Sequence, residues 1–424
     1  MKIAIIGSRG IPAKYGGFET FAEGLSTKLV KKGYDITVTC EYEPRKTRIS
    51  EFNGVKLDYF PFKPPSNYFL RKFYENISDI YFLIKSSRNY DLIYFLGIEV
   101  GMFLFIPHIL NRTLKLIVNI DGVMWKRTKF NKLERWLLKL NHVLATVFAD
   151  IIVADAKEMK KYVRNKYLKK TVFIPYGINI PSKIQWDEKK LLKLKDSCGT
   201  REFDSNINVL EKVMDETNIS VKFRQIAENK HINLYPNQYW LLVARLEHEN
   251  NIHIIVKAFS SSHSKYPLII VGDFTDNNYK KELHALVRDH PNIHFLGSIY
   301  DIELLDMLRQ NCFGYFHGHT VGGTNPSLLE AMSMKNIILA HGNQFNKEVC
   351  GNGALYFENS NSLKEKIELI ENSTENYQKL KLEAFNRVKE GYLWNGIISK
   401  YEFLFDNMNM KYPAKIDEKL DFQI

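Results

Sequence analysis

Short apolar runs alternate along this chain with longer segments whose apolar residues recur every three or four positions. The first run, residues 2–7 (KIAIIG), has the pattern of a buried strand and ends in glycine. Helical spacing follows over 18–32, with Phe21, Leu25 and Leu29 on one face. Apolar strands separated by helices predict a parallel sheet that helices cover on both faces.

The same alternation fills two long stretches of the chain. In the first half it predicts strands at 35–40, 55–60, 91–97, 114–121, 150–156 and 171–177. The helices predicted between them are 69–86, 99–110, 130–148 and 157–166. In the second half the predicted strands are 240–246, 267–273, 293–298, 313–319 and 337–342. We therefore predict an α/β protein of two Rossmann-like, doubly wound parallel-sheet domains that face each other across a cleft.

The domain boundaries follow from where the alternation stops. Residues 1–178 form the first domain and residues 238–390 the second. Between them, 179–237 is charged and has few strand patterns, so we predict a helical insertion there, within 182–237. Residues 391–424 read as a helical segment that returns to the N-terminal domain. A chain of 424 residues is also too long for one ordinary core.

Composition favours a soluble globular protein, with 45% apolar and 25% charged residues. No run of about 18 apolar residues occurs, and the chain enters a strand at once, so we expect neither a membrane span nor a signal peptide. The cysteines are scattered, which fits a reducing cytoplasm better than a disulfide scaffold. They are Cys40, Cys198, Cys312 and Cys350.

Charge is uneven along the chain. Residues 1–170 hold 30 Lys and Arg against 16 Asp and Glu, whereas the remainder holds 29 against 32. Polyphosphate, nucleic acid and anionic lipid are candidate partners for the basic half, and a solvated surface with no partner is the alternative. No helix-turn-helix or RNA-binding motif supports a nucleic-acid-binding protein, so we expect no nucleic acid partner.

The segment 319–332, HTVGGTNPSLLEAM, has the pattern of a ligand-binding helix start. Asn325 is a favoured N-cap, and Gly322-Gly323 lets backbone amides approach a ligand. Such an amino terminus suits a phosphate. Glu330 lies about 7.5 Å further along the axis at ~1.5 Å per residue, within reach of a hydroxyl on a group attached to that phosphate. An ordinary helix start with a solvated glutamate is the alternative.

Two further strand ends carry candidate chemistry. Asp121 could orient a sugar hydroxyl or act as a base, although capping a turn is the commoner role, and the nearby Trp125 could stack on a sugar or pack. Arg245 offers a planar fork for a diphosphate, or a structural ion pair.

The pair Gly16-Gly17, ahead of helix 18–32, is a second phosphate candidate, with a flexible turn as the alternative. The first loop lacks a full G-x-G-x-x-G, which argues against a nicotinamide-dependent dehydrogenase.

Outside 182–237, nearly the whole chain resembles the retaining nucleotide-sugar glycosyltransferases of family 4, which have the GT-B fold. The resemblance rests on the motifs IPYG, VARLEHENNI and GGTNPSLLEAM. The segments GSRGIPAKYGGFET, DGVMWKR and VGGTNPSLLEAM look most like bacterial rhamnosyltransferases that assemble surface polysaccharides. This implies transfer of rhamnose, with retention, from a dTDP- or UDP-linked donor to a glycan on a polyprenyl diphosphate. Glucose, galactose or N-acetylhexosamine is the alternative donor sugar.

The family's residues carry over only in part. Glu330 matches the second glutamate of E-x7-E, which binds the ribose, but the first glutamate would fall at Gly322. Arg245 matches the diphosphate arginine, but the lysine expected five residues later is Asn250. The usual histidine of the second loop is replaced near Asp121.

The resemblance implies a reaction without metal or cofactor, in which fixed dipoles and Arg245 neutralise the departing diphosphate. Asp121 and Arg245 are the catalytic candidates. The predicted donor-binding residues are Gly16, Gly17, Arg245, Gly323, Thr324, Asn325 and Glu330.

A lipid-held acceptor implies a cytoplasmic enzyme that is peripheral at the inner face of the cell membrane, on an anionic surface. Residues 60–77 are the predicted contact, because aromatic and basic residues are interleaved there, with a helix core face as the alternative. They are Phe60, Phe62, Lys63, Tyr68, Phe69, Arg71, Lys72, Phe73 and Tyr74.

Overall fold

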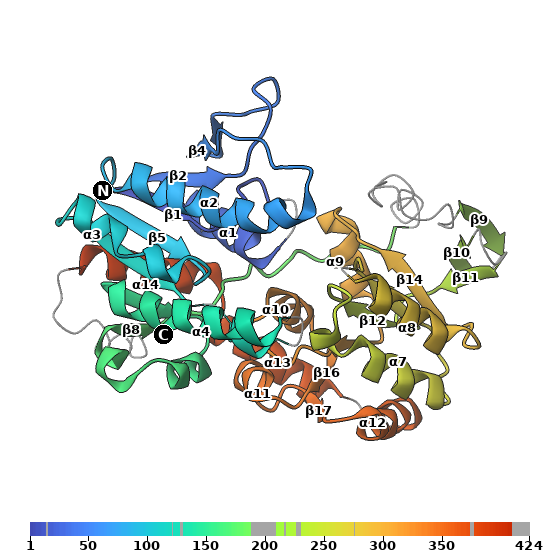
Figure 1. Ribbon diagram of the computed structural model, residues 1–424. Helices are drawn as coiled ribbons and strands as arrows, with labels where there is room; N and C mark the ends of the chain where they lie inside the picture. Colours follow the sequence, from blue (N-terminus) through green and yellow to red (C-terminus); the bar gives the residue numbers. More distant parts are fainter. Residues whose placement is uncertain are drawn as a thin grey trace. The chain divides into compact units, whose positions relative to one another are not determined.

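The computed structural model describes residues 1–13, 16–120, 122–127, 130–187, 209–215, 218–225, 230–274, 276–373 and 377–408. The chain divides into two compact units. The first comprises Met1–Ile178, Val321–Pro326 and Glu390–Ile424, and the second comprises Asn179–Thr320 and Ser327–Lys389. Each unit is described on its own below (Figure 1).

The first unit is built on an eight-stranded sheet of order β3-β4-β2-β1-β5-β6-β7-β8. All neighbours are parallel except the β3–β4 pair. The strands are β1 (Lys2–Ile6), β2 (Asp35–Cys40), β3 (Glu51–Phe52), β4 (Val55–Tyr59), β5 (Leu92–Leu96), β6 (Lys115–Asn119), β7 (Ile151–Ala154) and β8 (Thr171–Phe173). Because β2 and β5 pair with opposite edges of β1, the direction of winding reverses at β1.

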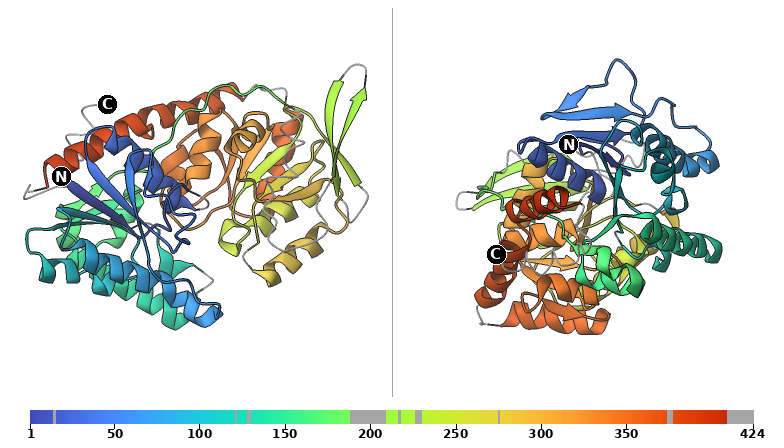
Figure 2. Two further views of the ribbon diagram at one scale, coloured as in Figure 1. Left: turned by 90° about the horizontal axis from the view of Figure 1, so that it is seen from above. Right: turned by 90° about the vertical axis from the view of Figure 1, so that its left-hand side faces the viewer.

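Helices cover both faces of this sheet. They are α1 (Gly17–Val30), α2 (Tyr68–Ser86), α3 (Ile106–Leu110), α4 (Lys132–Phe148) and α14 (Trp394–Asp406). In Figure 2 the light-blue α2 and green α4 lie on one side of the sheet and the red α14 on the other. Central strands such as β5 and β7 are buried at every residue, which explains why they read as continuous apolar runs.

Two predicted helices are shorter and tighter than expected. Residues 99–110 form the 3-10 segment η1 (Gly101–Phe103) and then the short α3, which has Pro107 in its first turn. Residues 157–166 are not an α-helix but parts of two 3-10 segments, η3 (Lys157–Tyr162) and η4 (Asn165–Lys170). A further 3-10 turn, η2 (Met124–Lys126), follows β6.

The second unit has a six-stranded, all-parallel sheet of order β14-β13-β12-β15-β16-β17. Its strands are β12 (Trp240–Val243), β13 (Leu268–Val271), β14 (Ile293–Gly297), β15 (Gly314–His317), β16 (Ile337–His341) and β17 (Leu355–Phe357). Its helical segments are η5 (His248–Asn250), α7 (Ile252–Ser261), α8 (Asn277–Val287), α9 (Ile302–Gln310), α10 (Pro326–Ser333), α11 (Gln344–Cys350), α12 (Ser360–Asn372) and α13 (Gln378–Gly391). The strand order reverses between β12 and β15.

The prediction of a helical insertion at 179–237 is wrong for the residues of this range that the structure describes. Three antiparallel strands form a separate sheet of order β11-β10-β9 there. They are β9 (Val209–Asp215), β10 (Asn218–Gln225) and β11 (Lys230–Leu234). Alternation in NISVKF at 218–223 is a strand pattern that the high charge of the segment obscured.

The C-terminal helix α14 packs into the core of the first unit. Trp394 is 6% exposed and belongs to the cluster that α1 and the sheet form. Its indole leaves no room at two glycines, because an added Cβ would lie 2.3 Å from the ring at Gly24 and 2.5 Å at Gly177. The close approach of Trp394 to α1 therefore depends on glycine at position 24.

We expect Gly24→Ala to lower the free energy of unfolding by roughly 1–3 kcal/mol, because overpacking outweighs the better helix propensity of alanine. Gly396→Ala in α14 is the matched control, since a Cβ there meets nothing within 4 Å. It should raise stability by about 0.5–1 kcal/mol. Urea unfolding of the full chain measures both, and a stabilising Gly24→Ala would contradict the packing described here.

Candidate functional site

The strand order places several predicted site residues at the carboxyl edges of the two sheets. In the second unit the winding reverses between β12 and β15, and ligands of open α/β sheets bind at such switch points. Arg245 follows β12, and the loop after β15 leads into α10, which carries Glu330. Both predicted donor contacts of this unit therefore follow strands that flank the switch point.

Arg245 lies in a turn that Asn250 supports. The Asn250 side-chain amide donates to the Arg245 carbonyl oxygen at 2.7 Å, and Asn250 itself is buried. The Arg245 side chain is 41% exposed, and its Nη1 lies 3.7 Å from Oε1 of Glu247. Asparagine at position 250, where the family pattern has lysine, thus holds the backbone from which Arg245 projects.

Glu330 is not a solvated helix residue, because its carboxylate pairs with Arg309 of α9. The Arg309 side chain is only 4% exposed, and its Nη1 also donates to Oδ1 of Asp306 at 3.1 Å. The Glu330 side chain is 29% exposed, against 4% for Arg309. The arginine therefore fixes Glu330 from the buried side.

The charges around Arg309 explain how an arginine can be buried here. Burial alone would lower the pKa of Arg309, but the charges of Glu330, Tyr315 and Asp306 outweigh burial and raise it, so the guanidinium keeps its charge. Burial raises the pKa of Glu330, and Arg309 opposes that shift. Sequence reasoning missed Arg309, for which the only local signal is an arginine beside the apolar face of DIELLDMLRQ.

In the first unit, α1 begins at the predicted pair Gly16-Gly17. Gly16 has φ 114°, and an added Cβ would lie 2.0 Å from Oε2 of Glu19. The Glu19 carboxylate accepts the Arg9 backbone N–H at 3.2 Å, and Oε2 of Glu23 accepts that of Ala13 at 2.6 Å. Burial raises the pKa of Glu19. A phosphate beside Gly16 would meet this carboxylate, so Gly17, with open space around its Cβ position, is the better candidate.

The segment Val321–Pro326 groups with the first unit and is held there by Asp155, at the end of β7. The backbone N–H of Thr324 donates to Oδ2 of Asp155 at 3.0 Å, and its hydroxyl donates to the Asp155 carbonyl oxygen at 2.5 Å. An added Cβ at Gly323 would lie 1.9 Å from the same carboxylate. A phosphate can therefore take the Thr324 amide only in exchange for this bond.

Asp121 lies outside the described residues, so its role stays a prediction. Trp125, four residues later, packs: its ring centroid lies 4.4 Å from that of His142 and 6.1 Å from that of Tyr162. Lys126 Nζ donates to the Tyr162 hydroxyl at 2.9 Å. In this structure Trp125 therefore packs against protein side chains, which was the alternative to stacking on a sugar.

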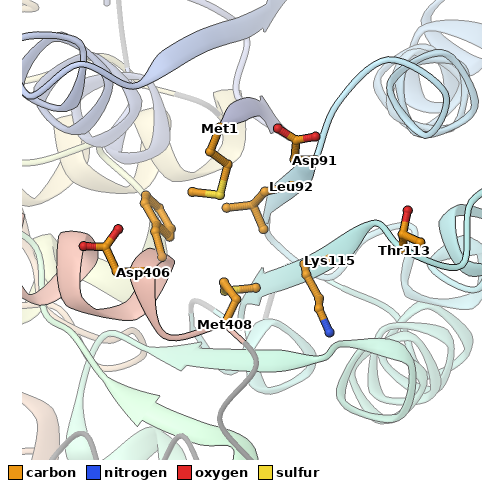
Figure 3. Close-up of a pocket in the computed structure, with 8 residues that line it drawn as sticks. Met1, Asp91, Leu92, Thr113, Lys115, Asp406 and Met408 are labelled. Atoms are coloured by element: carbon orange, nitrogen blue, oxygen red, sulfur yellow. The ribbon is translucent and has the colours of Figure 1, made fainter.

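Figure 3 shows a cavity of about 250 Å³ in the first unit, at the opposite edge of the sheet. It opens where β5 and β6 begin, and none of the predicted site residues lines it. Its lining comprises Met1, Asp91, Leu92, Thr113, Lys115, Phe405, Asp406 and Met408.

Two family models match separate parts of the chain. Residues 1–179 match a domain of unknown function (DUF1972), and residues 224–387 match the glycosyl transferases group 1. A protein of Klebsiella pneumoniae, described as an uncharacterized 42.6 kDa protein in the cps region, is 34% identical over 62 residues. That match spans 15% of this chain and 17% of the relative.

Solved structures resemble the chain over nearly its whole length. HepE from Anabaena, in complex with UDP-glucose, is 17% identical with a TM-score of 0.69, covering 96% of this chain and 99% of that one. Sucrose-phosphate synthase from Thermosynechococcus elongatus is 15% identical with a TM-score of 0.70, at the same coverage. The predicted GT-B fold is confirmed.

We expect Arg309→Met to lower the free energy of unfolding by roughly 3 kcal/mol, because it leaves two carboxylates without their shared cation. This is the low end of the range for broken buried pairs, since Glu330 is 29% exposed. Asp306→Asn, which keeps the Arg309–Glu330 contact, should cost less. Chemical denaturation of the full chain compares the two, and equal losses would show that Glu330 is not the main partner of Arg309.

Proposed function

We propose that this protein is a retaining glycosyltransferase of family 4 that transfers a sugar from a nucleoside-diphosphate donor. The observation that carries the proposal is that the matched group 1 segment contains both a half-exposed Arg245 after β12 and a Glu330 that Arg309 holds in place. A guanidinium suits the diphosphate, and a carboxylate suits ribose hydroxyls.

In this proposal the chain acts by positioning and by neutralising the leaving diphosphate. Arg245 binds the diphosphate directly, and the amides of Gly17, Gly323 and Asn325 add fixed dipoles, with Gly16 allowing the chain to turn. The Thr324 amide joins them when it exchanges its bond to Asp155 for one to the phosphate. Asp121 contacts the acceptor or the transferred sugar. Hydrogen-bond donors that already point at the leaving group need little rearrangement when negative charge develops on it.

We propose that no metal or other cofactor takes part. Arg245 and the backbone amides take the role that a divalent cation plays in other sugar transferases. In the described part of the chain, no group of three or more His, Cys, Asp or Glu side chains is arranged to hold a metal ion.

Rhamnose is the proposed donor sugar, carried on dTDP or UDP. Its support is the resemblance of GSRGIPAKYGGFET, DGVMWKR and VGGTNPSLLEAM to polysaccharide rhamnosyltransferases. The complex of HepE with UDP-glucose favours a nucleotide sugar in general and keeps another hexose as the alternative.

The proposed acceptor is a glycan on a polyprenyl diphosphate, and the proposed location is the cytoplasm, peripheral at the inner face of the cell membrane. The relative from a cps region supports a role in surface polysaccharide synthesis. The excess of 30 basic over 16 acidic residues in 1–170 supports contact with anionic lipid.

Binding of the donor nucleotide tests the two central residues. Arg245→Ala and Glu330→Gln should each weaken binding of dTDP or UDP at least tenfold, because a hydrogen bond to a charged group contributes roughly 1.5–3 kcal/mol. Arg288→Ala, which changes an exposed arginine at the end of α8, is the control. Calorimetry gives the affinities, and a parent-like affinity in Arg245→Ala would remove Arg245 from the diphosphate site.

Turnover tests the reaction itself. With a lipid-linked glycan acceptor, we expect dTDP-rhamnose to be consumed in preference to UDP-glucose or UDP-galactose, with the anomeric configuration of the donor retained in the product. Excess chelator should leave the rate unchanged. Inversion seen by NMR would overturn the family 4 assignment, and a magnesium-reversible loss of rate would overturn the metal-free mechanism.

A further inference from the structure

Exposed apolar side chains gather on one side of the first unit. In the described part of the chain, eighteen large apolar side chains are exposed, and eleven of them come from residues 62–137. These residues include α2, α3 and α4, the helices on the side of the sheet opposite α14 (Figures 1 and 2). A concentration of this kind on one layer differs from the scattered apolar residues of an ordinary surface.

Three of these residues form a ridge along α4. Leu133 is 65% exposed, Trp136 59% and Leu137 37%, and their spacing of three and four residues places them on one face of the helix. At 3.6 residues per turn, the buried His142 and Thr146 lie on the opposite face of α4. The helix thus packs on its own domain with one face and presents a second apolar face to the outside.

The neighbouring helices extend this surface. Phe73 and Ile77 of α2 are 45% and 56% exposed, and Ile109 of α3 is 71% exposed. We call the exposed large apolar side chains of 62–137 the apolar face. The segment predicted to contact the membrane, 60–77, supplies only part of it, because Phe60 and Tyr74 are buried whereas Phe62 and Phe73 are exposed. The side chains of Tyr68, Phe69 and Lys72 lie outside the described residues.

Basic residues accompany the apolar face. Residues 60–140 contain 13 Lys and Arg against 6 Asp and Glu. On α4, Lys132 and Lys139 are exposed beside the ridge, whereas Glu134 is engaged in the capping box with Asn131. Apolar and indole groups bordered by lysines match the headgroup layer of an anionic bilayer, which attracts the charges and accepts the rings.

We propose that the apolar face, with the α4 ridge Leu133–Trp136–Leu137 at its centre, docks the first unit on an anionic lipid bilayer. This rests on the proposed function, in which the acceptor is held in a membrane. Among the described residues, none of the helices combines the length and the apolar character of a membrane span. The positive charge selects an anionic lipid surface over a neutral apolar partner.

The test uses the full chain and vesicles of phosphatidylcholine with phosphatidylglycerol. The parent should sediment with these vesicles and not with pure phosphatidylcholine, and added salt should weaken binding. The triple variant Leu133→Ser, Trp136→Ser, Leu137→Ser should bind the anionic vesicles at least about tenfold more weakly, because it removes most of the ridge's apolar area.

A matched control comes from the second unit. Ile302, Leu369 and Leu382 are 74%, 59% and 51% exposed, and changing all three to Ser should leave vesicle binding unchanged. A spectroscopic readout is available as well. Among the five tryptophans, all within the described part of the chain, Trp136 alone is exposed. Anionic vesicles should therefore shift the parent's emission to shorter wavelength and should not shift that of the triple variant.

Three results would overturn the inference: a parent that ignores anionic vesicles, a triple variant that binds them like the parent, or an equal loss in the control variant. A parent that ignores vesicles but forms dimers that the triple variant abolishes would assign the face to a second copy of the chain instead. Binding of dTDP or UDP, measured in the same preparations, separates the two proposals. If nucleotide binding persists without vesicle binding, only docking fails, whereas absence of nucleotide binding counts against the proposed function.

Discussion

The need to bury both faces of parallel sheets determines the rest of this structure. Strands such as β5 and β7 expose no residue, so helices must cover each side. One of the helices that cover the sheet of the first unit is α14, which residues 394–406 form, far along the chain from the strands. With both faces covered, polar groups that bind ligands can gather only at the sheet edges, where the strand order reverses next to β1 and β12.

At those edges, three candidate residues each have a buried polar partner. Arg309 holds Glu330, Asn250 holds the Arg245 backbone and Asp155 holds Thr324. A buried charge is tolerated only when it is paired, and the pairing restricts the motion of the group in front of it. A site that stabilises charge through fixed dipoles and cations needs this kind of support. If such a group were mobile, ordering it would cost free energy before it could stabilise the charge.

The same covering helices give the first unit two different surfaces. Each helix packs on the sheet with one face, and its outer face is free to follow other constraints. On α4 that outer face remains apolar and is bordered by lysines, although exposing Leu133 and Trp136 to water brings no stability to the fold. In contrast, the exposed large apolar residues described in the second unit are fewer, and those on helices, such as Ile302 and Leu382, lie on separate helices.

The sequence by itself determined the properties that repeat over a few residues. Apolar runs and helical spacing predicted the parallel sheets and most of their helices, and the GT-B fold is confirmed. Local pattern also made Arg245 and Glu330 candidates, because it shows where a strand stops and where a helix begins. Only the tertiary structure decided which distant groups meet, such as Asp155 with Thr324, and which helix faces stay uncovered. It also showed strands within 209–234, where high charge concealed the alternation. The spacing of apolar residues predicts which side chains share a face of one helix or strand. Ion pairs between distant residues, and the covering of one helix face by another element, depend on how whole elements pack.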